Sequence, residues 1–118
     1  MDIKYIMKDK KGVTIAEEKQ LEWLHYSDGF MFPEYKNSRK KGTVILAKLG
    51  TKILGWALIF LNHNRKLTFF VYVSKLYRKM GIGSFLYKSA VSSFGDGLKV
   101  SRHNKIAQFF YDKVQNKV

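Results

Sequence analysis

One short segment holds the residue types that could bind a phosphate group. It runs from Val73 to Ser84 and joins an apolar stretch to a helix-like pattern through two glycines and several cations. The first amides of a helix have no internal partner and carry the positive end of the helix dipole. Glycines also let a ligand approach the backbone closely. The segment therefore predicts an anion cradle suited to a pyrophosphate.

Two common nucleotide-binding loops do not fit this segment. The dinucleotide fingerprint needs a third small residue, but counting from Gly81 that position is occupied by Leu86. A Walker-type loop needs Gly-Lys-Ser or Gly-Lys-Thr after four spacer residues, and the sequence contains none. Both nucleotide-binding interpretations are therefore excluded.

The elements that position this segment form a regular series. We expect a strand (3–8), a helix (15–25), an irregular basic loop (30–42), strands (43–49, 53–61 and 67–73), a helix from 82, a strand (98–101) and a helix from 104. This order predicts an α/β (α+β) fold with a single mixed, mostly antiparallel sheet flanked by helices. The length fits one domain over residues 1–118.

Local signals support the individual elements. Thr14 and Glu17 have the spacing of a capping box, which predicts a helix start. The stretch 67–73 is almost entirely apolar, so this strand should be buried on both faces. One face of the next helix is expected to hold Ile82, Phe85, Leu86, Ala90 and Phe94.

The cradle segment resembles the acetyl-coenzyme A motif of the GNAT acetyltransferase superfamily, Arg/Gln-x-x-Gly-x-Gly/Ala. It reads Arg78-Lys79-Met80-Gly81-Ile82-Gly83, after Tyr77 and a strand that ends at Val73. A second match to the superfamily pattern Asn-x-x-Ala-x-x-aromatic/Leu-Tyr follows at Asn104, Ala107, Phe110 and Tyr111. The chain is therefore identified as a GNAT member. The resemblance is good over residues 43–116 and loose before them.

The resemblance implies an N-acetyltransferase that uses acetyl-CoA as co-substrate and needs no metal. It implies that the backbone of Val71, Tyr72 and Val73 pairs with the pantetheine arm, and that one amide there polarises the thioester carbonyl. The pyrophosphate would bind amides of Arg78, Lys79, Met80, Gly81, Ile82, Gly83 and Ser84. The side chains of Arg78 or Lys79 could also meet phosphate charge, although Lys79 fits an ordinary solvated lysine equally well.

The resemblance also implies a catalytic role for Tyr111, which would protonate the departing thiolate as general acid. The alternative is a core tyrosine on an apolar helix face. Asn104 could bond the cofactor arm or cap the last helix. The general base stays open, and its candidates are His25, Asp28, Glu34, His103 or a chain of water molecules.

Charge and composition bear on partners and compartment. The chain has 22 Lys and Arg against nine Asp and Glu, a net charge of +13, and no cysteine. The missing cysteine excludes a thiol nucleophile, in keeping with direct transfer in a ternary complex. No apolar run approaches the roughly 20 residues that cross a bilayer. We expect a soluble cytoplasmic protein without membrane partners.

The positive field favours an acidic protein or an RNA-linked amine as acceptor over a polycationic one. A solvated lysine-rich surface that aids solubility explains the charge equally well. The alternative function is a catalytically weak GNAT-fold module whose basic surface binds nucleic acid or an acidic protein. Family members usually continue into two further strands that help close the acceptor site, whereas this chain ends at Val118. The expectation is a fold that lacks those last strands, as a homodimer or a minimal variant.

Overall fold

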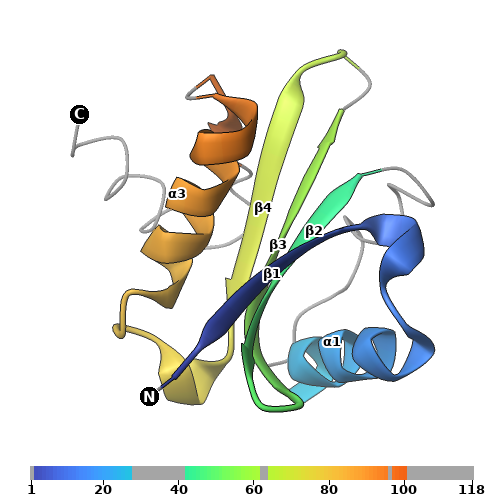
Figure 1. The fold of residues 1–118 in the computed structure, drawn as a ribbon, viewed down its shortest axis with the longest axis vertical. Coiled ribbons are helices and arrows are strands. Elements are labelled where there is room, and N and C mark those ends of the chain that lie inside the picture. The colour runs from blue at the N-terminus through green and yellow to red at the C-terminus, as the bar shows by residue number, and fades with distance from the viewer. Residues whose placement is uncertain (1, 28–41, 62–63, 96, 101–118) are drawn as a thin grey trace.

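The computed structural model describes residues 2–27, 42–61, 64–95 and 97–100. Its elements are shown in Figure 1. In chain order they are β1 (Lys4–Asp9), η1 (Lys10–Gly12), α1 (Ile15–Ser27), β2 (Thr43–Leu49), β3 (Lys52–Leu61), β4 (Leu67–Val73), η2 (Lys75–Tyr77), α3 (Ile82–Phe94) and β5 (Lys99–Val100). Both η elements are single 3₁₀ turns.

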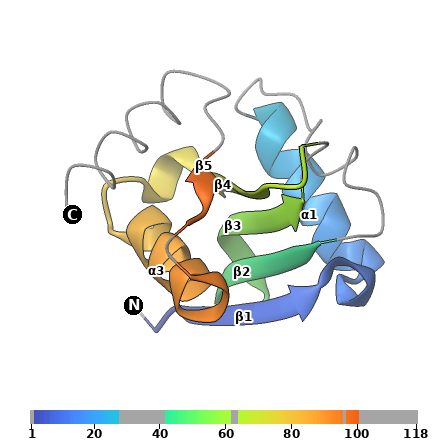
Figure 2. The same ribbon diagram turned by 90° about the horizontal axis from the view of Figure 1, so that it is seen from above.

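The strands form one sheet in the order β1-β2-β3-β4-β5. The first four strands are antiparallel to their neighbours, whereas β5 runs parallel to β4. Helix α3 covers one face of the sheet and α1 lies on the other (Figures 1 and 2). The predicted α+β class with a mixed, mostly antiparallel sheet is confirmed.

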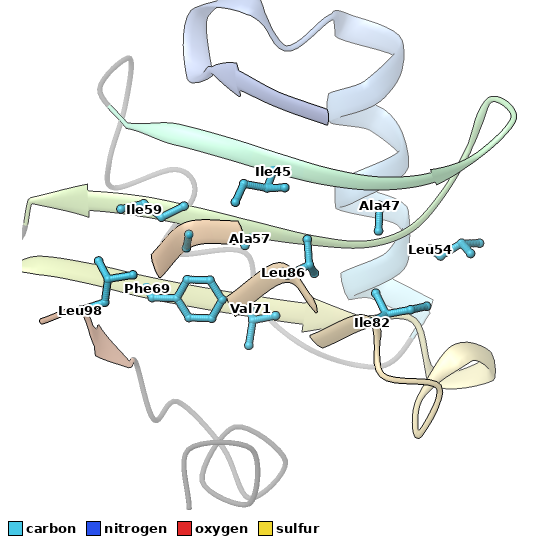
Figure 3. Packing of buried hydrophobic residues seen from close by; sticks show 11 residues of the cluster. Ile45, Ala47, Leu54, Ala57, Ile59, Phe69, Val71, Ile82, Leu86 and Leu98 are labelled. Carbon is cyan, nitrogen blue, oxygen red and sulfur yellow. The ribbon is translucent and has the colours of Figure 1, made fainter. Parts of the chain in front are cut away.

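Side chains of the strands alternate between two apolar clusters, one on each face. The cluster under α3, shown in Figure 3, consists of Ile45, Ala47, Leu54, Ala57, Ile59, Phe69, Val71, Ile82, Leu86, Ala90 and Leu98. The cluster under α1 consists of Val13, Leu21, Val44, Leu46, Ile53, Trp56, Leu58, Phe70 and Tyr72. Since β4 contributes to both clusters, its expected burial on both faces is confirmed.

The sequence-based bounds agree with the structure to within about two residues for the elements described. Three features of the structure differ from the sequence-based predictions. The turn η2 was not predicted, and α1 continues to Ser27. Phe85, expected on the buried face of α3, is 50% exposed and stacks on Tyr5 of β1, with ring centroids 4.1 Å apart. Of the expected loop 30–42, only residue 42 is described. The expected last helix, from residue 104, lies outside the described residues.

The buried carboxylate of Glu17 links helix α1 to the sheet. The predicted capping box is present, because the Thr14 N–H donates to Glu17 Oε1 at 2.9 Å and the Glu17 N–H donates to Thr14 Oγ1 at 3.1 Å. Lys8 of β1 and Lys48 of β2 also reach Glu17, with Nζ–O distances of 2.8 and 3.0 Å. One side chain therefore caps the helix and ties it to two strands.

Two further contacts join α1 to the sheet. The Gln20 side chain donates to the Thr51 carbonyl at 2.9 Å and accepts from the Ile53 N–H at 3.0 Å. Near the other end of the helix, the Tyr72 hydroxyl donates to the Leu24 carbonyl at 2.9 Å. The second contact connects α1 to the last residues of β4.

We predict that Glu17→Gln lowers the free energy of unfolding at pH 7 by about 1–3 kcal/mol, because two lysines lose a buried partner. Burial acts to raise the pKa of Glu17, but hydrogen bonds from Lys8, Thr14 and Lys48 outweigh it and lower the pKa from 4.5 to about 2. A depressed pKa stabilises the fold above pH 4.5, and this contribution is lost as the pH falls toward 2.

Urea unfolding between pH 7 and pH 3 measures the effect. The difference between the parent and Glu17→Gln should shrink as the pH falls. Glu22→Gln, on the same helix, is the matched control and should change stability by less than about 0.5 kcal/mol. Equal stability of the parent and Glu17→Gln at pH 7 would refute the role given to this carboxylate.

Candidate active site

In the described part of the chain, β5 pairs with only the first residues of β4. The described residues of β5 pair with Thr68 and Phe69, through Lys99 and Val100. From Val71 to Val73, no strand in the described part of the chain pairs with that side of β4. We call this segment, Val71 to Val73, the open edge.

The register with β3 determines which backbone groups face the open edge. The Ser74 N–H donates to the Leu54 carbonyl at 2.8 Å, and Val73 lies opposite Gly55. Hydrogen-bonded and non-bonded pairs alternate along an antiparallel ladder. The backbone groups of Tyr72 therefore point toward β3, whereas those of Val71 and Val73 point toward the open edge. The open edge can pair with an extended ligand much as a strand would.

The chain next forms the start of α3, which we call the cradle (Arg78 to Ser84). Lys79 and Gly81 have positive φ values of 67° and 83°, so the backbone turns sharply here. The Phe85 N–H donates to the Gly81 carbonyl at 3.0 Å and closes the first turn of α3. The amides from Gly81 to Ser84 consequently have no partner within the helix.

Within the first turn of α3, no acidic side chain competes for these amides. Gly81 is the N-cap residue, no side chain caps the helix, and its first turn contains no acidic residue. A Cβ placed on Gly81 would meet no atom of the described residues within 4 Å, apart from its chain neighbours and the backbone of its own helix. Backbone N–H groups, the helix dipole and open space at Gly81 together suit a phosphate ligand.

A glycine in β3 sets the distance between the cradle and the sheet. Ile82, the first residue of α3, is 1% exposed and packs in the cluster of Figure 3. A Cβ on Gly55 would lie 3.0 Å from the Tyr72 carbonyl oxygen and 3.3 Å from Ile82 Cγ2. The absence of a side chain at Gly55 lets the start of α3 approach the end of β4 closely. Gly55 was not among the residues singled out from the sequence.

Arg78 bonds the protein backbone. Its Nε donates to the Val73 carbonyl at 2.9 Å, and its guanidinium lies 5.6 Å from the centre of the Tyr72 ring. Lys79 is exposed. Beside the cradle, Lys52 donates to the Tyr77 hydroxyl at 3.0 Å. Sequence reasoning missed the contact between Arg78 and Val73, because it depends on which way the carbonyl at the end of β4 points.

The structure brings the predicted cofactor-binding residues from Val71 to Val73 and from Arg78 to Ser84 to one end of the sheet. Tyr111, Asn104 and His103 lie outside the described residues, as do Asp28 and Glu34. Of His25, only the backbone within α1 is described. The catalytic role of Tyr111 therefore stays a prediction.

The family model of the acetyltransferase (GNAT) family matches residues 11–116. The chain belongs to this family. The match includes α1, α3 and every strand after β1. The GNAT membership expected from the two sequence motifs is thereby confirmed.

Solved structures share the fold of this GNAT chain. ElaA from Escherichia coli is 13% identical with a TM-score of 0.73, over 96% of this chain and 86% of ElaA. The diaminobutyrate acetyltransferase EctA from Paenibacillus lautus was solved in complex with L-2,4-diaminobutyric acid and coenzyme A. It is 14% identical with a TM-score of 0.68, over 98% of this chain and 76% of EctA. YhhK from E. coli, bound to coenzyme A, is 11% identical with a TM-score of 0.68, over 98% of this chain and 89% of YhhK.

A search of curated proteins finds no match to the sequence. Within the described ranges, no helix is long and apolar enough to cross a membrane. The same ranges contain no group of three or more His, Cys, Asp or Glu side chains that could hold a metal ion.

We predict that Gly55→Ala lowers the free energy of unfolding by about 1–3 kcal/mol, because the added methyl group would press on backbone and on Ile82. Gly97→Ala is the matched control, since a Cβ there meets nothing within 4 Å. Thermal or urea unfolding of the two variants provides the measurement. If Gly55→Ala is as stable as Gly97→Ala, Gly55 does not set the spacing between α3 and the sheet.

Proposed function

We propose that this chain is an acetyl-CoA-dependent N-acetyltransferase that transfers an acetyl group to an amine by direct attack in a ternary complex. The observation that carries the proposal is the placement of the open edge and the cradle at the same end of β4. Membership of the GNAT family supports it, as do the coenzyme A complexes of EctA and YhhK.

In this proposal the cradle binds the pyrophosphate through the amides from Gly81 to Ser84. The open edge binds the pantetheine arm, because Val71 offers both an N–H and a carbonyl to an extended amide chain. The turn from β4 through η2 into α3 then keeps these two subsites at a fixed separation. Acetyl-CoA supplies the activated acetyl group as a thioester.

Two residues are proposed to act on the reacting atoms. The Val73 N–H, at the end of the open edge, donates to the thioester carbonyl oxygen as negative charge develops on it. Tyr111 donates a proton to the departing sulfur, as the GNAT resemblance implies.

The proposed transfer balances in atoms and electrons. The lone pair of the acceptor nitrogen forms the new C–N bond, and the C–S bond breaks with its electron pair left on sulfur. Tyr111 gives its hydroxyl proton to that sulfur. The proton lost by the amine goes to water or to a base among the open candidates, and it later restores the tyrosine.

The net charge of the chain bears on the acceptor. At +13 it repels a polycationic acceptor and attracts an acidic protein or an amine carried by RNA. We therefore propose an acceptor from one of these two classes, within a soluble cytoplasmic setting.

A second candidate function is a binding module with weak catalysis. Residues 35–95 contain twelve Lys and Arg and no Asp or Glu. Most of the sheet and all of α3 therefore belong to a stretch in which every charged side chain is a cation. Such a field favours polyanions and gives binding that weakens steeply with salt. A thiol-release assay over a panel of amines distinguishes the candidates, because the binding module would bind RNA or acidic protein without releasing coenzyme A.

We predict that Gly81→Asp weakens acetyl-CoA binding by at least about a hundredfold, because a carboxylate would occupy the phosphate space and oppose its charge. Gly95→Asp is the matched control. Gly95 also has a positive φ, 87° against 83°, and also has open space around its Cβ position. It lies at the other end of α3, about 20 Å away along the helix.

Calorimetric titration with acetyl-CoA measures both variants, and thermal unfolding checks that they fold equally well. The account requires binding to survive in Gly95→Asp and to be lost in Gly81→Asp. If Gly81→Asp binds as tightly as the parent, the phosphate site lies elsewhere.

We predict that Tyr111→Phe lowers turnover by about tenfold to a thousandfold, since one general acid is removed. The affinity for acetyl-CoA should change little, because the substitution removes only a hydroxyl group. Steady-state kinetics with an accepted amine, together with a titration of the cofactor, separate the two effects. Unchanged turnover under conditions in which chemistry limits the rate would remove Tyr111 from the mechanism.

A further inference from the structure

The last carbonyl of the open edge is occupied by a side chain of the protein itself. Val73 directs both its N–H and its carbonyl toward the open edge, and the carbonyl accepts a hydrogen bond of 2.9 Å from Arg78 Nε. The Ser74 N–H belongs to the same peptide group and donates to Leu54 at 2.8 Å. This peptide group is therefore held from both sides, which fixes its orientation.

The support behind Arg78 is rigid. Its guanidinium lies over the ring of Tyr72, which is 4% exposed and faces the cluster under α1. The Tyr72 hydroxyl is bonded to the Leu24 carbonyl of α1. Arg78 thus extends from the cradle around the end of β4 to the opposite face of the sheet. A guanidinium held over a fixed ring loses little further entropy when it donates a hydrogen bond.

An unoccupied Val73 carbonyl would oppose the proposed chemistry. Its oxygen carries partial negative charge next to the N–H that is proposed to stabilise developing negative charge on the thioester oxygen. A donor bonded to that carbonyl reduces this repulsion and leaves the end of the open edge as a hydrogen-bond donor.

We propose that Arg78 is a positioning residue: it holds the Val73 carbonyl so that the Val73 N–H alone faces the acetyl thioester, and it does not bind a phosphate. This inference rests on the function proposed above.

The position of the donor atom determines which side chains at position 78 can bond the Val73 carbonyl. In arginine, Nε is the fourth side-chain atom from Cα, and glutamine has its amide nitrogen at the same position. Lysine and methionine have a carbon there, which cannot donate. A phosphate contact would instead favour arginine or lysine, because both carry a positive charge.

The test compares Arg78→Gln, Arg78→Lys and Arg78→Met with three ligands. Acetyl-CoA and CoA differ only in the acetyl thioester, and S-acetylpantetheine keeps the thioester but lacks all phosphates. Calorimetry suits the first two ligands, and amide NMR titration suits the weaker third. Thermal unfolding of each variant reports on the fold.

We expect Arg78→Gln to bind all three ligands like the parent. Arg78→Lys and Arg78→Met should bind acetyl-CoA and S-acetylpantetheine about fivefold more weakly, the effect of one misplaced hydrogen bond. Their affinity for CoA should change less, so the preference for acetyl-CoA over CoA should fall. A loss of general stability alone would lower all three affinities without changing that preference.

Several results would overturn the inference. One is that Arg78→Lys keeps the parent's preference for acetyl-CoA over CoA. Another is that Arg78→Gln binds more weakly than the parent while Arg78→Lys binds like it. A third is that affinity falls only for acetyl-CoA and CoA, the two ligands with phosphates. If Arg78→Met does not fold, the comparison of glutamine with lysine still decides. If the parent binds none of the ligands, the proposed function fails, and this inference fails with it. If the parent binds all three and the variants match it, only the role of Arg78 fails.

Discussion

The antiparallel register between β3 and β4 is the constraint on which the candidate site depends. Tyr72 lies opposite Trp56, and the Ser74 N–H donates to the Leu54 carbonyl. Because bonded and non-bonded pairs alternate along an antiparallel ladder, Val71 and Val73 direct their backbone groups away from β3. Backbone groups inside a protein must find hydrogen-bond partners. In the proposed function, an extended ligand supplies those partners.

Backbone N–H groups form the donors of the candidate site. The amides of the cradle and the Val73 N–H are donors whose positions are fixed by the start of α3 and by the β3–β4 register. Because these groups are held in place before any ligand arrives, little reorganisation is needed to stabilise negative charge. Glu17, by contrast, is neutralised by Lys8 and Lys48 on the far side of the sheet from α3. This buried carboxylate therefore lies away from the cradle.

Local sequence patterns predicted the elements that local chemistry specifies. The capping box at Thr14 and Glu17, the bounds of β4 and the start of α3 at Ile82 were all readable, because each depends on neighbouring residues. Long-range geometry was not readable. The clearance at Gly55 and the bond from Arg78 to the Val73 carbonyl depend on how distant segments pack and which way one carbonyl points. The roles of Tyr111 and Asn104 stay predictions from the family resemblance.

The central claim is that one ligand contacts the open edge and the cradle together. Titration of isotope-labelled protein with acetyl-CoA, followed through its backbone amide NMR signals, tests this claim most directly. The account predicts saturable shifts with a common dissociation constant at the amides of Val71, Val73 and Gly81 to Ser84, and small shifts in β1. Absence of saturation, or shifts in the cradle without shifts at Val71 and Val73, would contradict it.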